Sequence, residues 1–455
     1  MARGKKKETL TPEERLQVAL VPEGEQPYKV PRNWCWVRLE LLLRSSKEKT
    51  EEFSDADLKY VGLEHMQKDG GIVAYDSAER VKSLKNVFHP QQILYGKLRP
   101  YLNKHDIATF DGVCSTDILV FNATSVTIPK FVNFFLDQDT FIEYAVSNSK
   151  GINLPRVSES VVLDAKCPLP PIYEQHRIVD RIESLFAKLD EAKQKAQDAL
   201  DSFETRKAAI LHKAFTGELT AQWRKEHGVG MKSWENLRLE NLIEGGPQNG
   251  LYKPQTAYGT GTKILRIDCF YEGAVLPWEN LKRLALSKNE IEQYHLNIND
   301  IVINRVNSMA YLGKSALIGE LPEECVFESN MMRITLNTRM VIPEYAIKYL
   351  NSVIGVQELR KNAKQAVNQA SINQQDVKNV AIKLPKLDEQ AEIVRILDDL
   401  LAKEQQAKEA AEGVLGQIDL IKKAILARAF RGELGTNDPS EESAQELIKN
   451  FIFKM

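Results

Sequence analysis

Long apolar runs and paired cysteines are missing from this sequence. No apolar run approaches the ~18 residues of a membrane-spanning helix, so we expect no membrane contact. The basic start, Arg3 to Lys7, is followed by no apolar stretch and is therefore not a secretory signal. It predicts a solvated tail or, alternatively, an arm that touches phosphate. The five cysteines are scattered, at Cys35, Cys114, Cys167, Cys269 and Cys325. Because none forms a Cys-x-x-Cys pair, neither a structural zinc site nor a disulfide framework is expected, and a reducing cytoplasm fits best.

An excess of positive charge is also missing. The 455 residues carry 61 Lys and Arg against 63 Asp and Glu, a formal net charge of −2. A protein that holds DNA alone normally has a surplus of Lys and Arg, which release counterions from phosphates. If DNA is the target, local patches or partner subunits must therefore supply much of the positive field. The length allows about three domains.

Motifs for catalysis are incomplete. Gly313-Lys314-Ser315 ends like a phosphate-binding loop, but Ser308 stands where that motif needs glycine. Gly259-Thr260-Gly261 lacks the strand–helix setting of a dinucleotide site. The seven histidines never form an H-x-x-x-H pair, and the Asp/Asn-Pro-Pro-aromatic motif of an amino-methyltransferase does not occur. We therefore expect no catalytic residue, no metal ligand and no cofactor bound by this chain.

One internal repeat organises the chain. Residues 169–219 and 384–434 align without a gap at a constant offset of 215, and 22 of the 51 aligned positions are identical. Each copy predicts one long helix. In the first copy Pro170 stands just before the start, Glu174 places negative charge in the first turn, and Gly217 lies where a helix commonly ends. The second copy has the same features, although Gly413 and Gly416 weaken its helix.

Apolar residues in both copies are spaced alternately four and three residues apart, which indicates a coiled-coil seam. In the first copy they are Ile178, Ile182, Leu185, Leu189, Ala192, Ala196, Ala199, Phe203 and Ile210. In the second copy they are Ile393, Leu397, Leu400, Ala407, Ala411, Val414, Ile418, Ile421 and Ile425, with Glu404 as a polar exception. Two unrelated amphipathic helices on separate domains are the alternative, but they leave the shared register unexplained.

The repeat divides the chain into alternating globules and helices. We expect a tail over 1–30, a globule over 31–168, a helix over 169–219, a linker over 220–232, a globule over 233–383, a helix over 384–434 and a tail over 435–455. The fold class is α+β: two similar mixed α/β globules, joined by two helices of roughly 60 Å that form an antiparallel coiled coil. The globules would then be related by a pseudo-twofold axis.

Strands in the two globules follow the same order. In the first, strands are predicted at 73–75, 92–95 and 117–121, followed by a helix from Pro129 through Tyr144. In the second, they are predicted at 263–267, 300–303 and 332–336, followed by a helix from Pro343 through Leu350. The shared order suggests two copies of one fold that diverged further than the helices did.

In each globule a stretch of basic, aromatic and amide residues begins at the end of a strand. The candidate DNA-binding residues are Lys97, Arg99, Tyr101 and Lys104 in the first globule, and Asn304, Arg305, Asn307, Tyr311 and Lys314 in the second. Arginine can bond guanine and asparagine can bond adenine in the major groove, while lysine can hold phosphate. A solvated turn is the alternative for either stretch.

The repeated motif resembles the conserved regions of type I restriction-modification specificity (S) subunits. It consists of Leu-Pro-Pro-x-x-Glu-Gln and Ile-Val, with Ala-Phe-x-Gly-Glu-Leu at the end; residues 214–224 are especially similar. The resemblance covers the whole chain in architecture, but its motifs are specific only in the two helical segments. A weaker match includes Gly151-Ile152-Asn153.

The resemblance implies a non-catalytic subunit that reads double-stranded DNA. Each globule would be a target recognition domain for one half of a split sequence, and the helices would set the spacer and dock two methyltransferase (M) subunits. Those partners would bind S-adenosylmethionine and methylate adenine, and restriction endonuclease/translocase (R) subunits would use ATP and Mg. The tail from Pro439 to Met455 would form a short helix that packs on the methyltransferase.

Two other functions remain open. A coiled-coil scaffold that binds only proteins would show no salt-dependent binding to duplex DNA. An enzyme with an unrecognised site would methylate or cleave DNA as the isolated chain.

Overall fold

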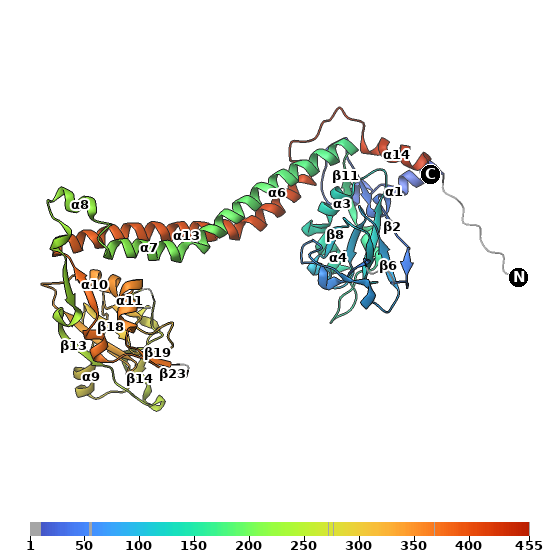
Figure 1. Cartoon of the computed structure of the whole chain (residues 1–455). Helices are drawn as coiled ribbons and strands as arrows, with labels where there is room; N and C mark the ends of the chain where they lie inside the picture. Colours follow the sequence, from blue (N-terminus) through green and yellow to red (C-terminus); the bar gives the residue numbers. More distant parts are fainter. Residues whose placement is uncertain (1–10, 54–56, 272, 276, 368, 455) are drawn as a thin grey trace. The chain divides into compact units, whose positions relative to one another are not determined.

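The chain divides into two compact units, Met1–Ala196 with Gly413–Met455, and Gln197–Glu412. The computed structural model describes residues 11–53, 57–271, 273–275, 277–367 and 369–454 (Figure 1). The predicted phosphate-touching arm lies outside these residues. Each unit contains one globule, here called a head, together with the start of one long helix and the end of the other. Among the described helices, none combines the length and apolar character needed to cross a membrane.

The first head is built on two sheets. One has the order β2 (Leu43–Ser45), β10 (Ile118–Ala123), β7 (Ile93–Gly96) and β8 (His105–Ile107). The other has the order β3 (Lys49–Thr50), β6 (Lys85–Phe88), β9 (Gly112–Cys114), β4 (Lys59–Val61) and β5 (Asp76–Ser77). Helices α3 (Pro129–Leu136), α4 (Asp139–Ser147) and α5 (Glu159–Asp164) follow, and β1 (Cys35–Arg38) pairs with β11 (Lys166–Leu169) directly before the long helix.

The second head repeats this plan. Its first sheet has the order β13 (Ile243–Asn249), β22 (Met331–Leu336), β18 (Asp300–Asn304) and β20 (Ser315–Leu317), and its second β17 (Lys282–Leu284), β14 (Tyr258–Leu265) and β21 (Cys325–Phe327). Smaller elements are the β15–β16 pair (Phe270–Tyr271, Ala274–Val275) and the sheet β19 (Val306–Asn307), β24 (Gln369–Ser371), β23 (Lys364–Ala366). The helices are α9 (Lys288–Tyr294), α10 (Pro343–Leu350), α11 (Val353–Arg360) and α12 (Gln374–Lys378), and β12 (Glu235–Arg238) pairs with β25 (Ala381–Leu384).

Corresponding strands pair in the same way in both heads. The antiparallel β10–β7–β8 set matches β22–β18–β20, and the parallel pair β4–β9 matches β14–β21. The prediction of two similar mixed α/β domains is therefore confirmed. Two of the predicted elements of the first head are wrong. Residues 73–75 form no strand, because Val73 and Tyr75 are exposed and pair with no neighbouring strand. The helix after Pro129 is interrupted by the extended backbone of Gln138.

The first repeat copy forms two helices where one was expected. α6 (Ile172–Asp201) and α7 (Phe203–Phe215) are separated at Ser202, whose hydroxyl donates to the carbonyl oxygens of Asp198 (2.8 Å) and Ala199 (3.2 Å). Such bonds compete with the helical ladder and often bend a helix. The second copy, α13 (Leu387–Ala429), is continuous through both of its glycines.

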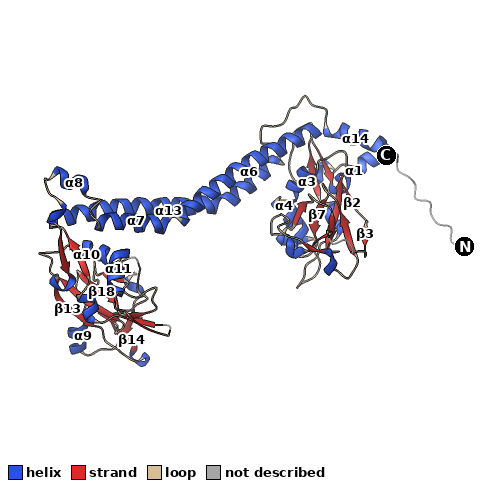
Figure 2. Cartoon of the chain, viewed as in Figure 1, coloured by secondary structure: helices blue, strands red, loops and turns tan. Residues whose placement is uncertain are grey.

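The long helices lie side by side within each unit (Figure 2), and their contacts show that they run antiparallel. In the first unit Lys422 pairs with Asp190 at 2.6 Å. Further along, Thr436, beyond the end of α13, bonds Glu174 near the start of α6. In the second unit Arg206 pairs with Glu404 at 2.8 Å. Residue numbers fall along α6 as they rise along α13, from the Asp190–Lys422 pair to the Glu174–Thr436 pair. The prediction of an antiparallel coiled coil is therefore confirmed.

The seam of the first copy is as predicted, whereas three of the nine apolar positions predicted for the second copy are wrong. Every predicted position of α6 and α7 is buried or half-buried, but Ala407, Val414 and Ile421 of α13 are exposed. The half-buried positions are one residue later, at Leu401, Lys408, Leu415 and Lys422. Two large rings explain this shift, because the Nζ of Lys408 lies 4.9 Å from the ring centre of Phe203 and that of Lys422 lies 5.1 Å from that of Phe186.

The expected tails and linker contain folded segments. α1 (Pro12–Ala19) packs against α14 (Ala444–Lys454) (Figure 1). Ala444, Ile448 and Ile452 of α14 are buried in the core of the first head. One apolar face of this helix is therefore covered by its own head, while Phe453 is 52% exposed. The linker forms α8 (Ala221–Glu226).

Repeat-related residues build the joint between helices and head in each unit. At the second joint, the buried carboxylate of Glu389 accepts hydrogen bonds from Thr220 (2.7 Å), Arg224 (2.6 Å) and Trp234 (2.9 Å). Phe215, at the end of α7, packs edge-on against Tyr345 and Tyr349 of α10.

The first joint uses the equivalent positions with different partners. The buried carboxylate of Glu174 accepts from Thr436 (2.7 Å) and from Arg177 (2.8 Å), and Phe430 packs on Phe131 and Phe135 of α3. Burial raises the pKa of Glu174 although both donors oppose the rise. Each repeat copy thus supplies the start of one joint and the end of the other, which explains why its two ends are its most similar parts.

Candidate nucleic-acid interface

The first candidate segment, here called the first loop (residues 97–104), is fixed to the end of α3. Asn103 donates to the carbonyl oxygen of Leu136 at 3.0 Å. The buried ring of His105 lies 2.8 Å from Asn133 Oδ1 and 2.9 Å from Asp137 Oδ1. Burial alone would lower the pKa of His105, but the Asp137 carboxylate outweighs it, so that this pKa is raised. These contacts tie the end of the first loop to α3 and the residue that follows it.

Two of the four candidate residues in the first loop are exposed. Arg99 adopts a left-handed backbone (φ +52°), and its side chain and that of Tyr101 face solvent. Lys97 is half-buried, 4.0 Å from Asp117. Lys104 donates to the carbonyl oxygen of Leu63 at 2.7 Å. Arg99 and Tyr101 are therefore placed to reach a ligand, whereas Lys104 supports the loop.

The second loop (residues 305–314) is fixed by α11. Arg360 donates from Nε to the carbonyl oxygen of Leu312 (2.8 Å) and from Nη2 to that of Ala310 (3.1 Å). Asn304, directly before the loop, is fully buried, and neither atom of its side-chain amide has a hydrogen-bond partner among the described residues. Its position excludes direct contact with a ligand at the surface.

The other candidate side chains of the second loop differ in their exposure and in their contacts. Arg305 is half-buried and donates to the carbonyl oxygen of Ser329 at 3.0 Å. The side chain of Asn307 accepts from the next backbone N–H. Tyr311 is exposed, whereas Lys314 lies over the ring of Phe270, 5.1 Å from its centre, and burial lowers its pKa. Arg305, Asn307 and Tyr311 keep some surface.

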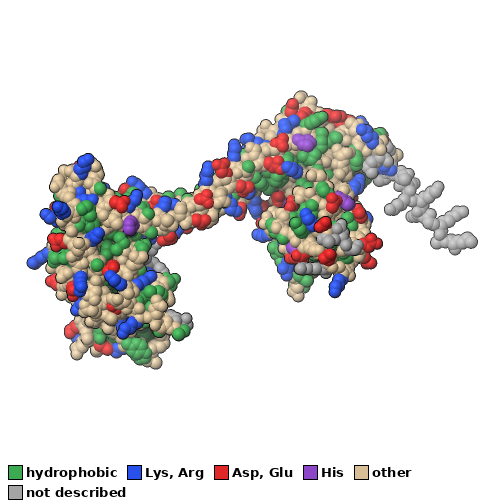
Figure 3. Space-filling view, in the orientation of Figure 1, with side chains coloured by type: hydrophobic (Ala, Val, Ile, Leu, Met, Phe, Trp, Pro, Cys, Tyr) green, Lys and Arg blue, Asp and Glu red, His purple; other side chains and the backbone are tan. Residues whose placement is uncertain are grey.

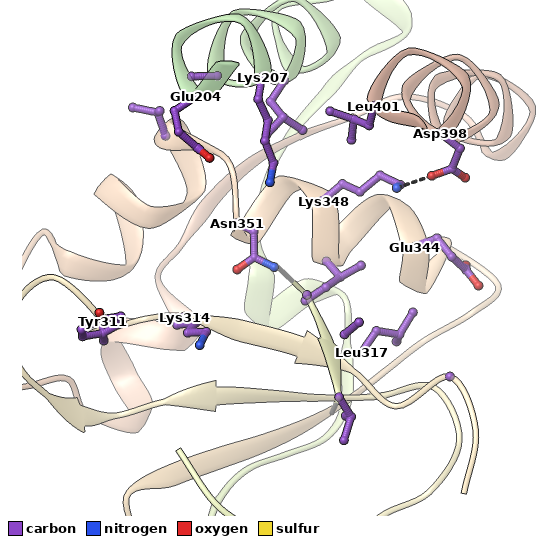
Figure 4. A pocket seen from close by; sticks show the side chains of 18 of the residues that line it. Glu204, Lys207, Tyr311, Lys314, Leu317, Glu344, Lys348, Asn351, Asp398 and Leu401 are labelled. Carbon is purple, nitrogen blue, oxygen red and sulfur yellow. Dashed lines mark hydrogen bonds and ion pairs between the residues drawn. The ribbon is translucent and has the colours of Figure 1, made fainter. Parts of the chain in front are cut away.

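An open pocket of about 1050 Å³ adjoins the far end of the second loop. Tyr311 and Lys314 line one side, and side chains from α7, α10 and α13 line the others (Figure 4). Its charges are mixed, with Lys348 paired to Asp398, and Asn351 bonds both the N–H and the carbonyl oxygen of Ser315. In the described part of the chain, no group of His, Cys, Asp and Glu could hold a metal ion.

A β-hairpin lies against each loop, and the sequence indicated it only through the weak match at Gly151–Asn153. In the first head Lys150 and Arg156 exchange two backbone hydrogen bonds of 2.9 Å, and the N–H of Arg99 donates to the carbonyl oxygen of Pro155 at 2.7 Å. In the second head β23 and β24 form the hairpin, and β24 pairs with β19 inside the loop. Loop and hairpin are therefore one continuous surface in each head.

Surface charge follows the balance of the sequence. On the face shown in Figure 3, blue basic and red acidic side chains are interspersed over both units. Near the first loop Arg156 is paired with Asp117 at 2.9 Å, and Lys47 with Glu159 at 2.8 Å. Near the first loop these basic side chains are therefore partly neutralised by neighbouring carboxylates.

Comparison with known proteins shows similarity to one family. The family model described as the type I restriction modification DNA specificity domain matches residues 231–412. The EcoDI specificity subunit of Escherichia coli is 34% identical over 44% of this chain and 45% of its own length. The EcoKI specificity subunit of Escherichia coli (strain K12) is 27% identical over 71% of this chain and 68% of its own length. Residues 231–412 thus match a type I restriction modification DNA specificity domain, and the chain is similar to type I specificity subunits.

Solved structures share the fold. The HsdS subunit from Thermoanaerobacter tengcongensis is 24% identical, with a TM-score of 0.67 over 90% of this chain and 100% of its own. A chain from a study of complex assembly and conformational transition of the type I R-M system is 22% identical, with a TM-score of 0.65 and the same coverage. The match to the EcoDI subunit spans less than half of that relative.

Proposed function

We propose that this chain is the DNA-sequence-reading subunit of a type I restriction-modification complex and has no catalytic activity of its own. Each head reads one half of a split target in double-stranded DNA, and the long helices set the spacer between the halves. The observation that carries this proposal is the duplicated loop. Both heads present a hydrogen-bonded, partly basic loop directly after the equivalent strand of the equivalent sheet, β7 in the first head and β18 in the second.

The length of the connecting helices supports a split target. The 43 residues of α13 correspond to about 64 Å of helix. One turn of B-DNA is ~34–36 Å, so a separator of this length suits two half-sites about one to two turns apart. A spacer of unread base pairs follows naturally from such a design.

Partner subunits supply the chemistry in this proposal. Two methyltransferase subunits bind S-adenosylmethionine and methylate one adenine in each half-site, and restriction endonuclease/translocase subunits use ATP and Mg to cleave unmodified DNA. A surface for the methyltransferase is offered by Val414, Leu420 and Ile421 of α13, which are 41%, 67% and 40% exposed. Exposed apolar side chains close together often mark a protein interface. Partners also provide positive charge that this chain lacks.

Methylation mapping tests the proposal. The chain is co-expressed with a cognate methyltransferase, and the DNA is sequenced for methylated adenine. We expect one motif with two defined halves and a fixed gap. Absence of modification, or a single uninterrupted motif, would contradict two-headed reading and favour the protein-binding scaffold. The chain expressed alone is the control, because methylation without the partner would reveal an enzyme.

Among the candidate residues, Arg99 is placed best for direct contact. Replacing it by alanine should weaken binding of the complex to its target duplex by about 1–3 kcal/mol if the guanidinium bonds a base, and relax selectivity at that position only. Lys104→Ala is the matched comparison in the same loop, since its ammonium is engaged with Leu63. Titrations at fixed salt with target and single-mismatch duplexes measure both effects. Equal loss on every sequence would mean that Arg99 holds phosphate instead.

A further inference from the structure

The tips of the two hairpins carry the most exposed large apolar side chains of the described chain. Ile152 is 98% exposed and Val367 is 92% exposed, while the next, Tyr252, is 79% exposed. The two positions are separated by 215 residues, which is the offset of the helical repeat. Two aliphatic side chains left in water at equivalent points of two diverged heads indicate a shared task, because stability gains nothing from them.

The open ends of both hairpins are held beside the candidate loops by backbone bonds. In the first head the N–H of Val157 donates to the carbonyl oxygen of Lys97 at 3.0 Å; in the second the N–H of Ile372 donates to that of Arg305 at 2.9 Å. Lys97 and Arg305 occupy the same place after β7 and β18. A ligand bound to a loop therefore meets the adjoining hairpin as well.

Charge next to the tips favours a polyanion as the occupant. Lys150 is exposed at the base of the first hairpin, and Lys97, Arg99 and Arg156 lie beside it, with Asp117 and Glu159 as the nearby carboxylates. Lys364 is exposed in β23 of the second hairpin. An open groove of about 600 Å³ adjoins the first hairpin and is lined by Lys97, Lys150 and Arg156 among others.

We propose that these hairpins enter a groove of duplex DNA and that Ile152 and Val367 make apolar contacts with the bases there. This inference rests on the proposed function. The major groove admits a two-stranded β-ribbon, and aliphatic side chains contact the thymine methyl group in it. A single aliphatic tip among polar residues fits a groove better than it fits a protein surface, where the buried centre of an interface is broader and more apolar.

The test measures binding of the complex with its methyltransferase to the mapped target. Ile152→Ala and Val367→Ala should each weaken binding about tenfold, the lower end of what full burial of an aliphatic side chain contributes. Each should also lose discrimination at positions in one half-site only, a different half for each variant. Val73→Ala and Ile298→Ala, at exposed sites outside the hairpins (62% and 57%), should bind as the unchanged chain does.

The outcomes distinguish a failure of the hairpin contact from a failure of the proposed DNA-reading function. If the unchanged complex prefers no sequence, the proposed function fails. If it reads its target and the hairpin variants match the controls, only the hairpin contact is overturned. If the variants lose the methyltransferase while the remaining complex binds DNA normally, the tips dock a protein, which also overturns it. Because both side chains are almost fully exposed, unchanged melting temperatures are expected, and a loss of binding then reports contact.

Discussion

Replacing Arg224 by alanine should lower the free energy of unfolding of the second unit by about 3–5 kcal/mol, the cost of leaving a buried charge without its partner. The Arg224 and Glu389 side chains are only 7% and 2% exposed, and their N–O distance is 2.6 Å. Arg224 also bonds the hydroxyl of Thr220 at 2.9 Å and the carbonyl oxygen of Gly217. Its loss therefore removes several bonds in the second joint at once.

Urea unfolding followed by circular dichroism measures this effect. Arg395→Ala is the matched control, because Arg395 pairs with Glu392 on the exposed side of the same helix, and such pairs contribute under about 1 kcal/mol. Adding Glu389→Gln to Arg224→Ala should recover part of the loss, since the neutral amide removes the buried charge, its oxygen can accept from Trp234 and its NH2 group can donate to the Thr220 hydroxyl. If the single variant is as stable as the control, the joint does not depend on this ion pair.

Exchanging the first head for that of another specificity subunit should change one half of the target completely and leave the other half and the spacer unaltered. The exchange spans residues 31–168. The second head lies in the other unit and has its own core, so its reading surface is untouched. Methylated-adenine sequencing of cells that carry the hybrid and its methyltransferase gives the result directly. A change in both halves would refute modular reading.

The donor head must fit the joint that remains. Phe430 of the repeat packs on Phe131 at 5.0 Å and on Phe135 at 5.6 Å between ring centres, and Thr127 bonds Gln175 at 2.9 Å. A hybrid that keeps these three head residues should fold and methylate. One in which Phe131 and Phe135 are both alanine should lose stability in the first unit, with about 3–5 kcal/mol expected for each buried aromatic. Comparing the two hybrids separates a failure to fold from a failure to read DNA.

Local patterns account for much of the architecture. The repeat offset, the prolines before each long helix and the glycines after it are sequence features, and the structure has helices and turns where they predict them. Gly217 illustrates the reason: its φ is +83°, a backbone conformation that residues with a Cβ rarely adopt, so that turn favours glycine. The antiparallel pairing follows from two similar seams that bury each other.

The seam of α13 shows where pattern reasoning stops. By hydrophobicity, Ala407, Val414 and Ile421 are good heptad positions, and they are exposed. The half-buried positions are instead Leu401, Lys408, Leu415 and Lys422, two of which are charged. The lysines are accepted there because their ammonium groups lie over Phe203 and Phe186, which are contributed by the other repeat copy. A hydrophobicity pattern within one helix contains no information about the rings opposite it.

By itself the sequence determined the duplicated plan, the helical connectors, the α/β heads and the two loops that end a strand, because these follow from periodicity and chain-local turn chemistry. Only the tertiary structure decided which loop residues remain available. Lys104 and Lys314 are engaged by Leu63 and Phe270, while Arg99 and Tyr311 face solvent. It also joined Arg224 to Glu389 across 165 residues and brought Ile152 and Val367 beside the loops. The burial and the contacts of these side chains depend on which distant segments of the chain pack together, and local sequence patterns do not specify that.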